Sequence, residues 1–225
     1  MSARAALAVS GSNVTGDAPF SCALRLPGGP NGSASIVEAR SAPGVRGDLA
    51  ALVRDLCALH GVRPQDLGEI RVDLGPGSYT GLRVAVTFVR FLQRFSALPV
   101  FATDSLSLLA TAALGRDLRG RRVRPLLDAR RGRFHTAVLQ SDTVLRLVEE
   151  PKAVPLASIA AAAAGDLVVC SAVIEQVAAE ALRGAEILVA AGVAARDLFR
   201  PELALTEAAG ADLAPHYLMG SYAEE

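Results

Sequence analysis

The sequence predicts an α/β fold in which mixed β-sheets are flanked by helices. Strand-like and helix-like segments alternate along the chain, and apolar residues in one segment recur with the spacing of a helix face. Hydrophobic residues make up 51% of the 225 residues, which is sufficient for one large domain or two small ones. Aromatic residues make up only 4% and Trp is absent, so we expect a core of Ala, Val and Leu.

The first half of the chain has the clearest pattern of elements. Three strand-like runs are separated by segments rich in Gly, Asn, Pro and Ser, which favours an antiparallel meander. Asp48 and Gly61 then flank an amphipathic run, as is typical of the start and end of a helix. We predict strands at 5–9, 20–26, 33–39, 69–74 and 98–102, and helices at 48–60 and 80–95. The order βββαβαβ is that of a ribonuclease-H-like half-domain, the unit duplicated in actin-like ATPases, although other α/β folds share parts of it.

The second half of the chain is less regular. A turn at Ser141 and Asp142 is expected to join two strands. The segment from 215 to 225 has no clear pattern, and no internal repeat is strong enough to be named. We predict helices at 103–114, 156–164, 173–182 and 193–199, and strands at 123–127, 134–140, 144–148, 167–170 and 186–189.

The charge of the chain is balanced overall but uneven locally. With 23 basic and 23 acidic residues, no field of the whole molecule favours nucleic acid or a membrane. The segment 116–133, however, holds eight arginines against two aspartates. It could be a solvated arginine-rich loop, or a docking patch for an acidic partner or RNA. The lack of interleaved aromatic residues favours the solvated loop.

Cysteine use and hydropathy predict the location of the protein. Cys22, Cys57 and Cys170 lie far apart and form no C-x-x-C pair, which disfavours a disulfide framework or a zinc site and indicates a reducing compartment. The apolar run at 5–9 is too short for the core of a signal peptide. No run approaches the roughly 18 apolar residues of a membrane helix. We therefore expect a soluble, cytoplasmic protein without membrane contact.

The segment 73–83, with the sequence D-L-G-P-G-S-Y-T-G-L-R, is the most informative part of the chain. Its glycines allow positive φ or close backbone approach, and its proline fixes φ between them. Ser78 or Thr80 could then cap a helix whose free N–H groups hold an anion. The alternative is a tight strand-to-helix junction without a ligand. The pattern is neither a Walker A loop nor a complete G-x-G-x-x-G, which favours the junction.

The predicted helix at 80–95 is unusually apolar. Arg83, Thr87, Arg90 and Arg94 fall on one narrow stripe, and nearly all other positions are apolar. Such a helix is either buried on two sides or presents a second apolar face to a partner. The thin polar stripe favours a partner.

These residues resemble the signature G-P-G-S-[FY]-T-G-L-R of the TsaB (YeaZ) family. Blocks at 98–106, 125–132 and 215–218 are similar to further family segments in the same order. The motif positions are Gly75, Pro76, Gly77, Ser78, Tyr79, Thr80, Gly81, Arg83, Asp128 and Arg130.

The resemblance implies an actin-like (ASKHA) fold of two subdomains, each a mixed sheet flanked by helices. A ribonuclease-H-like subdomain at 1–102 would be rejoined by the segment at about 190–225, and a smaller one would occupy 103–189. The family implies a non-catalytic scaffold that dimerises with itself or with a TsaD-type paralogue, which transfers the threonylcarbamoyl group. A TsaE-type ATPase would join the complex, and tRNA would be reached only indirectly. No catalytic residue, cofactor or metal is expected in this chain.

The family's contact surface uses the first two helices of the N-terminal subdomain, which agrees with the apolar character of the second one. The residues expected at the interface are Leu52, Leu56, Leu59, Leu82, Val86, Phe88, Val89 and Arg90.

Departures from the family pattern keep alternatives open. The family opens with a strand ending in Asp-Thr-Ser, whereas this chain has Ser10, Gly11 and Ser12. An actin-like ATPase needs a carboxylate at that turn, so an ATP-dependent kinase of the superfamily is the less favoured alternative. The segment 87–91 also departs from the family, which leaves open a homodimeric binding protein with a repurposed interface. A metallopeptidase is disfavoured because the histidines stand alone in the sequence.

Overall fold

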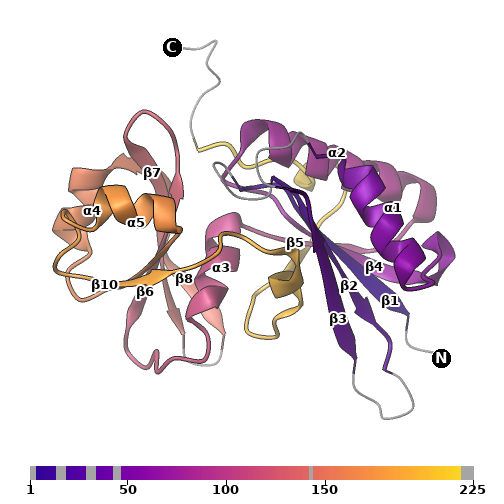
Figure 1. Ribbon diagram of the computed structural model, residues 1–225, viewed down its shortest axis with the longest axis horizontal. Coiled ribbons are helices and arrows are strands. Elements are labelled where there is room, and N and C mark those ends of the chain that lie inside the picture. The colour runs from indigo at the N-terminus through magenta and orange to yellow at the C-terminus, as the bar shows by residue number, and fades with distance from the viewer. Residues whose placement is uncertain (1–3, 14–18, 29–33, 43–46, 142–143, 219–225) are drawn as a thin grey trace.

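Residues 4–13, 19–28, 34–42, 47–141 and 144–218 are described by the structure, which is a computed structural model (Figure 1). They form two β-sheets with helices packed against them, as the sequence predicts. The predicted strand start at Ser33, the turn residue Asp142 and the tail 219–225 lie outside the described residues.

The first sheet is mixed and has the strand order β11-β5-β4-β1-β2-β3. Strands β1 and β2, like β2 and β3, are antiparallel, whereas β4 runs parallel to β1 and β5 parallel to β4. Its strands are β1 (Ala5–Ser10), β2 (Ser21–Leu26), β3 (Ser35–Arg40), β4 (Leu67–Asp73), β5 (Val100–Thr103) and β11 (Thr206–Glu207).

The second sheet repeats this arrangement with the order β10-β9-β6-β7-β8. Adding five to each strand number converts the first order, apart from β11, into the second, and the directions of pairing also agree. The fold is therefore a structural duplication, as the family resemblance implied, although the sequence has no recognisable internal repeat. Its strands are β6 (Arg122–Asp128), β7 (Arg133–Ser141), β8 (Leu145–Pro155), β9 (Leu167–Cys170) and β10 (Glu186–Val189).

Helices α1 (Leu49–Leu59) and α2 (Tyr79–Ser96) lie together on one side of the first sheet (Figure 1). Leu7 and Val9 of β1 point into the core beneath them. The alternating residues Ala6 and Ala8 point to the other face, because successive side chains of a strand face opposite ways. That other face belongs to a second core cluster.

The second core cluster joins the two sheets. It combines Ala6 and Ala8 of the first sheet with Val123 and Leu139 of the second. Helix α3 (Ser105–Ala110) lies between the sheets, and its Leu106 is fully buried in this cluster (Figure 1). The small alanine side chains allow the layers to approach closely. The division of the chain into subdomains at 102 and 189 stays a prediction.

Several predicted elements differ in the structure. The predicted helix at 193–199 is only a short 3₁₀ segment, η3 (Ala195–Phe199), because its backbone is tied across the first sheet: the Ala195 N–H donates to Ser21 Oγ at 2.9 Å. The apolar spacing there reflects burial against a sheet and not a helix. The remaining elements are η1 (Pro64–Asp66), η2 (Thr111–Ala113), α4 (Leu156–Ala162), α5 (Ala172–Ala178) and η4 (Gly210–Asp212).

Three further predictions need correction. Helix α3 ends at Ala110 and continues only as a 3₁₀ turn, short of the predicted 114. Helix α5 ends at Ala178, short of 182. Strand β8 extends to Pro155 instead of 148, because its exposed, charged residues pair with β7 through backbone hydrogen bonds that hydropathy cannot reveal. Among the described residues, no helix is both long and apolar enough to cross a membrane.

Candidate partner-binding site

The turn between β4 and α2 is held by backbone hydrogen bonds on several sides. Gly75 has a φ of 102°, a left-handed value that suits glycine, and the Gly75–Pro76 peptide bond is cis. The Gly75 carbonyl accepts the Ser105 N–H at 2.8 Å, and the Leu74 carbonyl accepts the His216 N–H at 2.6 Å. The turn therefore fastens α3 and the C-terminal segment to the end of β4.

Helix α2 begins in close contact with the segment that follows β1. The Ser78 Oγ accepts the Gly81 N–H at 3.2 Å and caps the helix. Ser78 was one of the two residues predicted to be the cap. A Cβ atom on Gly81 would overlap with the carbonyl oxygen of Gly11, and one on Gly77 would overlap with that of Ser12. Only glycine permits this approach of two backbones.

Two N–H groups of this turn are engaged inside the protein. The Ser78 N–H donates to the Ser12 carbonyl at 2.9 Å, and the Gly81 N–H is held by the cap. Gly75 and Pro76 are buried, whereas Tyr79 and Thr80 are exposed. This arrangement supports a strand-to-helix junction rather than a phosphate-binding loop.

Asp73 ends β4 in a buried cluster of serines. Val72 pairs with Val9 in the parallel ladder, so Asp73 lies beside Ser10, where the family has its usual aspartate. Ser105 Oγ donates to Asp73 Oδ2 at 2.6 Å, whereas Oδ1 has no hydrogen-bond partner among the described residues. Burial raises the pKa of Asp73, and the nearby hydroxyls of Ser105, Ser12 and Ser10 oppose this shift.

The Asp73 carboxyl is fully enclosed and cannot contact a substrate in this conformation. A kinase of the superfamily would need its carboxylates open to metal and phosphate. Within the described ranges, no group of three or more His, Cys, Asp or Glu residues is placed to hold a metal ion.

Half of the expected interface residues lie in the core. Leu56 of α1 and Leu82, Val86 and Val89 of α2 pack against the first sheet and are almost fully buried. They cannot supply contact surface in this fold, because the sheet takes up the apolar face on which they lie. Leu52 and Phe88 are partly buried, whereas Leu59 and Arg90 are exposed.

The exposed face of α2 carries apolar residues that the sequence analysis did not select. Phe91 is 61% exposed and Phe95 is 75% exposed, and their ring centroids lie 4.7 Å apart. With Val84 and Phe88 they recur at spacings of four, three and four residues, which was the signal available in the sequence. A row of large exposed apolar side chains is typical of an interaction site.

The N-terminal end of this face carries a small aromatic cluster. The rings of Tyr79 and Tyr217 lie 4.8 Å apart between centroids. The Arg83 Nη1 donates to Tyr79 Oη at 2.7 Å, and its guanidinium carbon lies 5.3 Å from the Tyr79 ring centroid. The family blocks at 74–84 and 215–218 therefore meet in space at the start of α2.

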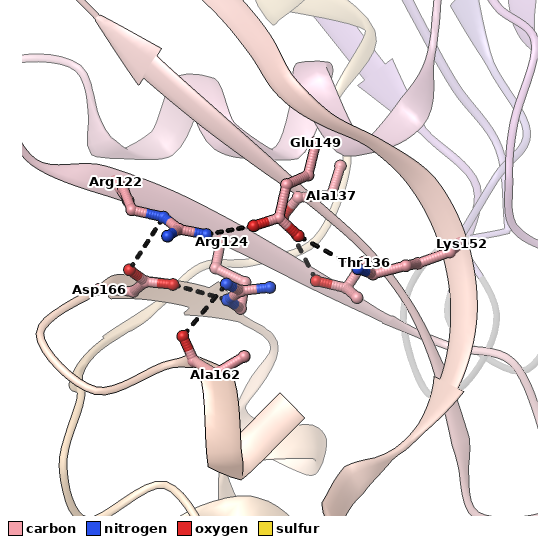
Figure 2. A network of polar contacts seen from close by, with 8 residues as sticks. All are labelled: Arg122, Arg124, Thr136, Ala137, Glu149, Lys152, Ala162 and Asp166. Carbon is pink, nitrogen blue, oxygen red and sulfur yellow. Dashed lines mark hydrogen bonds and ion pairs between the residues drawn. The ribbon is translucent and has the colours of Figure 1, made fainter. Parts of the chain in front are cut away.

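The arginine-rich segment is not the solvated loop that the sequence analysis favoured. Its second part forms β6, where Arg124 is buried and its Nε donates to Asp166 Oδ2 at 2.7 Å (Figure 2). Arg122 contacts both Glu149 and Asp166 in the same network. Arg116 and Arg121 pair with Glu186. Distant carboxylates thus neutralise much of the local charge.

Asp128 and Arg130 form the tip of the β6–β7 hairpin. The Arg130 N–H donates to Asp128 Oδ1 at 2.7 Å, and Arg130 has a φ of 68°. Asp128 also borders a cavity of about 400 Å³ that has mainly apolar walls and includes Asn13 and Ser171. The geometry supports a local turn contact for Asp128 and Arg130. This motif does not belong to the exposed face of α2.

The duplicated sheets define a ribonuclease-H-like protein of the actin-like (ASKHA) class. The family model that describes TsaD, tRNA N6-adenosine threonylcarbamoyltransferase, matches residues 46–160. A curated relative, tRNA threonylcarbamoyladenosine biosynthesis protein TsaB of Bacillus subtilis (strain 168), is 42% identical over 94 residues, which cover 39% of this chain and 40% of the relative. The protein of the same name from Escherichia coli (strain K12) is 29% identical over 91 residues, which cover 40% of this chain and 39% of that relative.

Solved structures agree with this assignment at the level of the fold. "YeaZ from Pseudomonas aeruginosa" superposes with a TM-score of 0.73 at 24% identity, covering 96% of this chain and all of that one. An uncharacterized protein described as similar to peptidase YEAZ from Pseudomonas aeruginosa gives the same TM-score of 0.73 and the same coverage at 23% identity. The chain belongs to the family that the matching model describes, as a member of the TsaB (YeaZ) type, which confirms the prediction from its motifs. The matched segments span only 40% and 39% of the lengths of the two curated relatives.

Proposed function

We propose that this chain is a non-catalytic subunit that binds and activates a TsaD-type transferase in the threonylcarbamoyladenosine modification of tRNA. The observation that carries the proposal is the outer apolar face of α2, formed by the exposed Val84, Phe91 and Phe95 and the partly buried Phe88. The names of the relatives supply the pathway.

The relationship to the transferase supports this pairing. The model that matches residues 46–160 is named for the transferase itself, so the proposed partner has a related fold. Related chains can pair through equivalent surfaces around an approximate two-fold axis, which is the commonest symmetry of soluble oligomers. Each partner would then cover the other's second helix.

The wider assembly follows from the same proposal. A TsaE-type ATPase joins the pair, and tRNA is contacted by the transferase and only indirectly by this chain. The chain itself uses no cofactor. Because the substrate is tRNA, the complex works in the cytoplasm.

Two other functions receive less support. An ATP-dependent kinase would need an accessible carboxylate near the first turn, whereas position 10 is Ser and Asp73 is enclosed. A homodimeric binding protein with a repurposed interface would use the same exposed residues of α2 and remains the second candidate. The composition of the complex separates these possibilities.

The decisive experiment is size-exclusion chromatography with light scattering on the chain alone and mixed with the TsaD-type protein of the same genome. We expect a heterodimer that Phe91→Glu abolishes, because a carboxylate would be buried in an apolar contact. The matched control is Val177→Glu, which places the same charge at an exposed apolar position of α5. Circular dichroism should show that both variants stay folded.

Two results would contradict the proposal. One is a chain that ignores the transferase at micromolar concentrations. The other is a heterodimer that Phe91→Glu leaves intact, which would place the contact elsewhere. A homodimer that Phe91→Glu abolishes, with no heterodimer formed by the wild type, would favour the homodimeric binding protein.

A further inference from the structure

The exposed face of α2 consists of two parallel stripes. The apolar stripe contains the exposed Val84, Phe91 and Phe95 and the partly buried Phe88. The second stripe precedes it by one residue at every step and contains Arg83, Thr87, Arg90 and Arg94. Because both stripes have spacings of four, three and four residues, they run side by side along the helix for about three turns.

The charge of this face is not compensated within the described protein. Helix α2 contains no Asp or Glu, and Arg90 and Arg94 form no ion pair with any described residue. Arg83 contacts the hydroxyl and ring of Tyr79, which carry no charge to offset its own. The arginines of the segment 116–124 behave differently, because carboxylates of other elements pair with them.

We propose that this face binds a helix whose apolar stripe is flanked by Asp or Glu side chains. The inference rests on the proposed function and adds to it the chemistry of the partner's contact surface. Apolar side chains of the partner would cover Phe91 and Phe95, and its carboxylates would pair with Arg90 and Arg94. Helix pairs commonly use this division, in which an apolar seam supplies stability and flanking charges choose the partner.

A second copy of the chain fits this face less well. A two-fold pairing would set α2 against itself, and the α2 of the second copy brings three more arginines and no carboxylate. The repulsion between the two Arg stripes would be greatest at low ionic strength. An acidic partner removes this repulsion and gains attraction instead.

RNA also carries negative charge, but the aromatic residues are poorly arranged for it. The rings of Phe91 and Phe95 are inclined by 50° and pack against each other. Bases of single-stranded RNA stack on flat, accessible aromatic faces. The continuous stripe of Val and Phe side chains is instead suited to the side chains of a helix.

The first experiment uses two designed helical peptides with the same apolar stripe, flanked by Glu in one and by Lys in the other. Fluorescence anisotropy with the full chain should show that the Glu peptide binds about 10-fold more tightly at low salt, because its carboxylates pair with the Arg stripe whereas the Lys peptide is repelled. Arg90→Glu/Arg94→Glu should reverse this preference. Arg146→Glu, a charge reversal at an exposed position of β8, should leave it unchanged.

The second experiment measures the affinity of the TsaD-type protein for the same variants at several salt concentrations. We expect Arg90→Glu/Arg94→Glu to weaken the heterodimer about 10-fold at low salt and less at high salt. If Phe91→Glu abolishes the heterodimer but the arginine reversal has no effect, the proposed function holds and the acidic partner helix is refuted. If no heterodimer forms at all, the proposed function fails, and the peptides still decide the preference of the face.

Other results would overturn the inference. Equal or absent binding of the two peptides would show that the Arg stripe does not select its partner. A single-stranded RNA oligonucleotide that binds more tightly than the Glu peptide, and is lost in Phe91→Ala, would identify RNA as the occupant. Self-association that tightens at low salt and is lost in Phe91→Glu would identify a second copy.

Discussion

Arg124 is the largest side chain that is fully buried in the described part of the protein. Its guanidinium is held by Asp166 and by the carbonyl of Ala162 at 3.4 Å (Figure 2). A buried charge needs such partners, because the protein interior solvates an ion far less well than water. Burial thus turns Arg124 into a structural residue that fastens α4 to the second sheet, whereas Arg90 and Arg94 keep their charge available at the surface.

At the same scale, His135 makes folding depend on pH. Burial lowers the pKa of His135 from 6.5 to about 4, and the charge of Asp128 opposes this shift. The unfolded chain takes up a proton as the pH falls below 6.5, but the folded protein does not until about pH 4. The stability contributed by the neutral imidazole is therefore present above pH 6.5 and is lost as the pH falls towards 4.

We expect the free energy of unfolding to fall by about 2 kcal/mol more in the wild type than in His135→Gln between pH 7.5 and pH 5. Urea denaturation of both proteins at these pH values measures the difference. Equal losses would show that His135 takes up its proton in the folded protein as readily as in the unfolded chain.

At the scale of the element, the position of α2 is decided at its first turn. Glycines at 11 and 81 let the start of the helix touch the segment after β1, and the Ser78 cap orients it. This contact directs the apolar stripe of Leu82, Val86 and Val89 onto the sheet. The Phe91 and Phe95 rings are consequently left on the outer side.

Gly81→Ala should destabilise the protein by about 1–3 kcal/mol, because its Cβ would meet the backbone of Gly11 and no flexible side chain can give way. The control is Gly184→Ala, where the nearest atom lies 3.7 Å away and the change should have little effect. Urea denaturation compares the two. A Gly81→Ala variant as stable as the control would show that the two backbones can separate without loss.

At the scale of the whole molecule, the two sheets share one core. Ala6 and Ala8 of the first sheet, Leu106 of α3 and Leu139 of the second sheet belong to one core cluster. A core that takes side chains from both sheets couples them energetically. Opening at this boundary would expose apolar residues of the shared cluster, such as Ala8 and Leu106, to water.

We therefore expect the two sheets to unfold in one transition, and Leu106→Ala to lower the stability of both by about 2–5 kcal/mol. Hydrogen exchange of the β1 and β6 amides gives the opening free energy of each sheet separately. A variant that destabilises only the second sheet, or two separate transitions in the wild type, would show that the halves fold independently.

Local chemistry made much of this protein predictable from its sequence. The helix cap of Asp48, the spacing of apolar residues in α1 and α2, and the glycine-containing turn after β4 all act over a few residues, so their pattern is visible in the chain itself. The α/β fold class followed from these local patterns, whereas the family followed from the resemblance of the segment 74–84 to a known signature. Where apolar spacing arose from burial against a sheet, as at 193–199, the same reasoning predicted a helix wrongly.

The tertiary structure decided what depends on contacts between distant residues. Arg121 pairs with Glu186 and Arg124 with Asp166, and no local rule links these positions. The repeated strand order of the two sheets left no recognisable repeat in the sequence, because many different apolar residues can fill equivalent core positions. The sequence by itself determined that α2 has more apolar surface than a helix needs in order to pack one face on a sheet. Only the packing of α2 on the first sheet decided which residues are core and which are left for a partner, because a helix has no fixed inner side until its neighbours are in place.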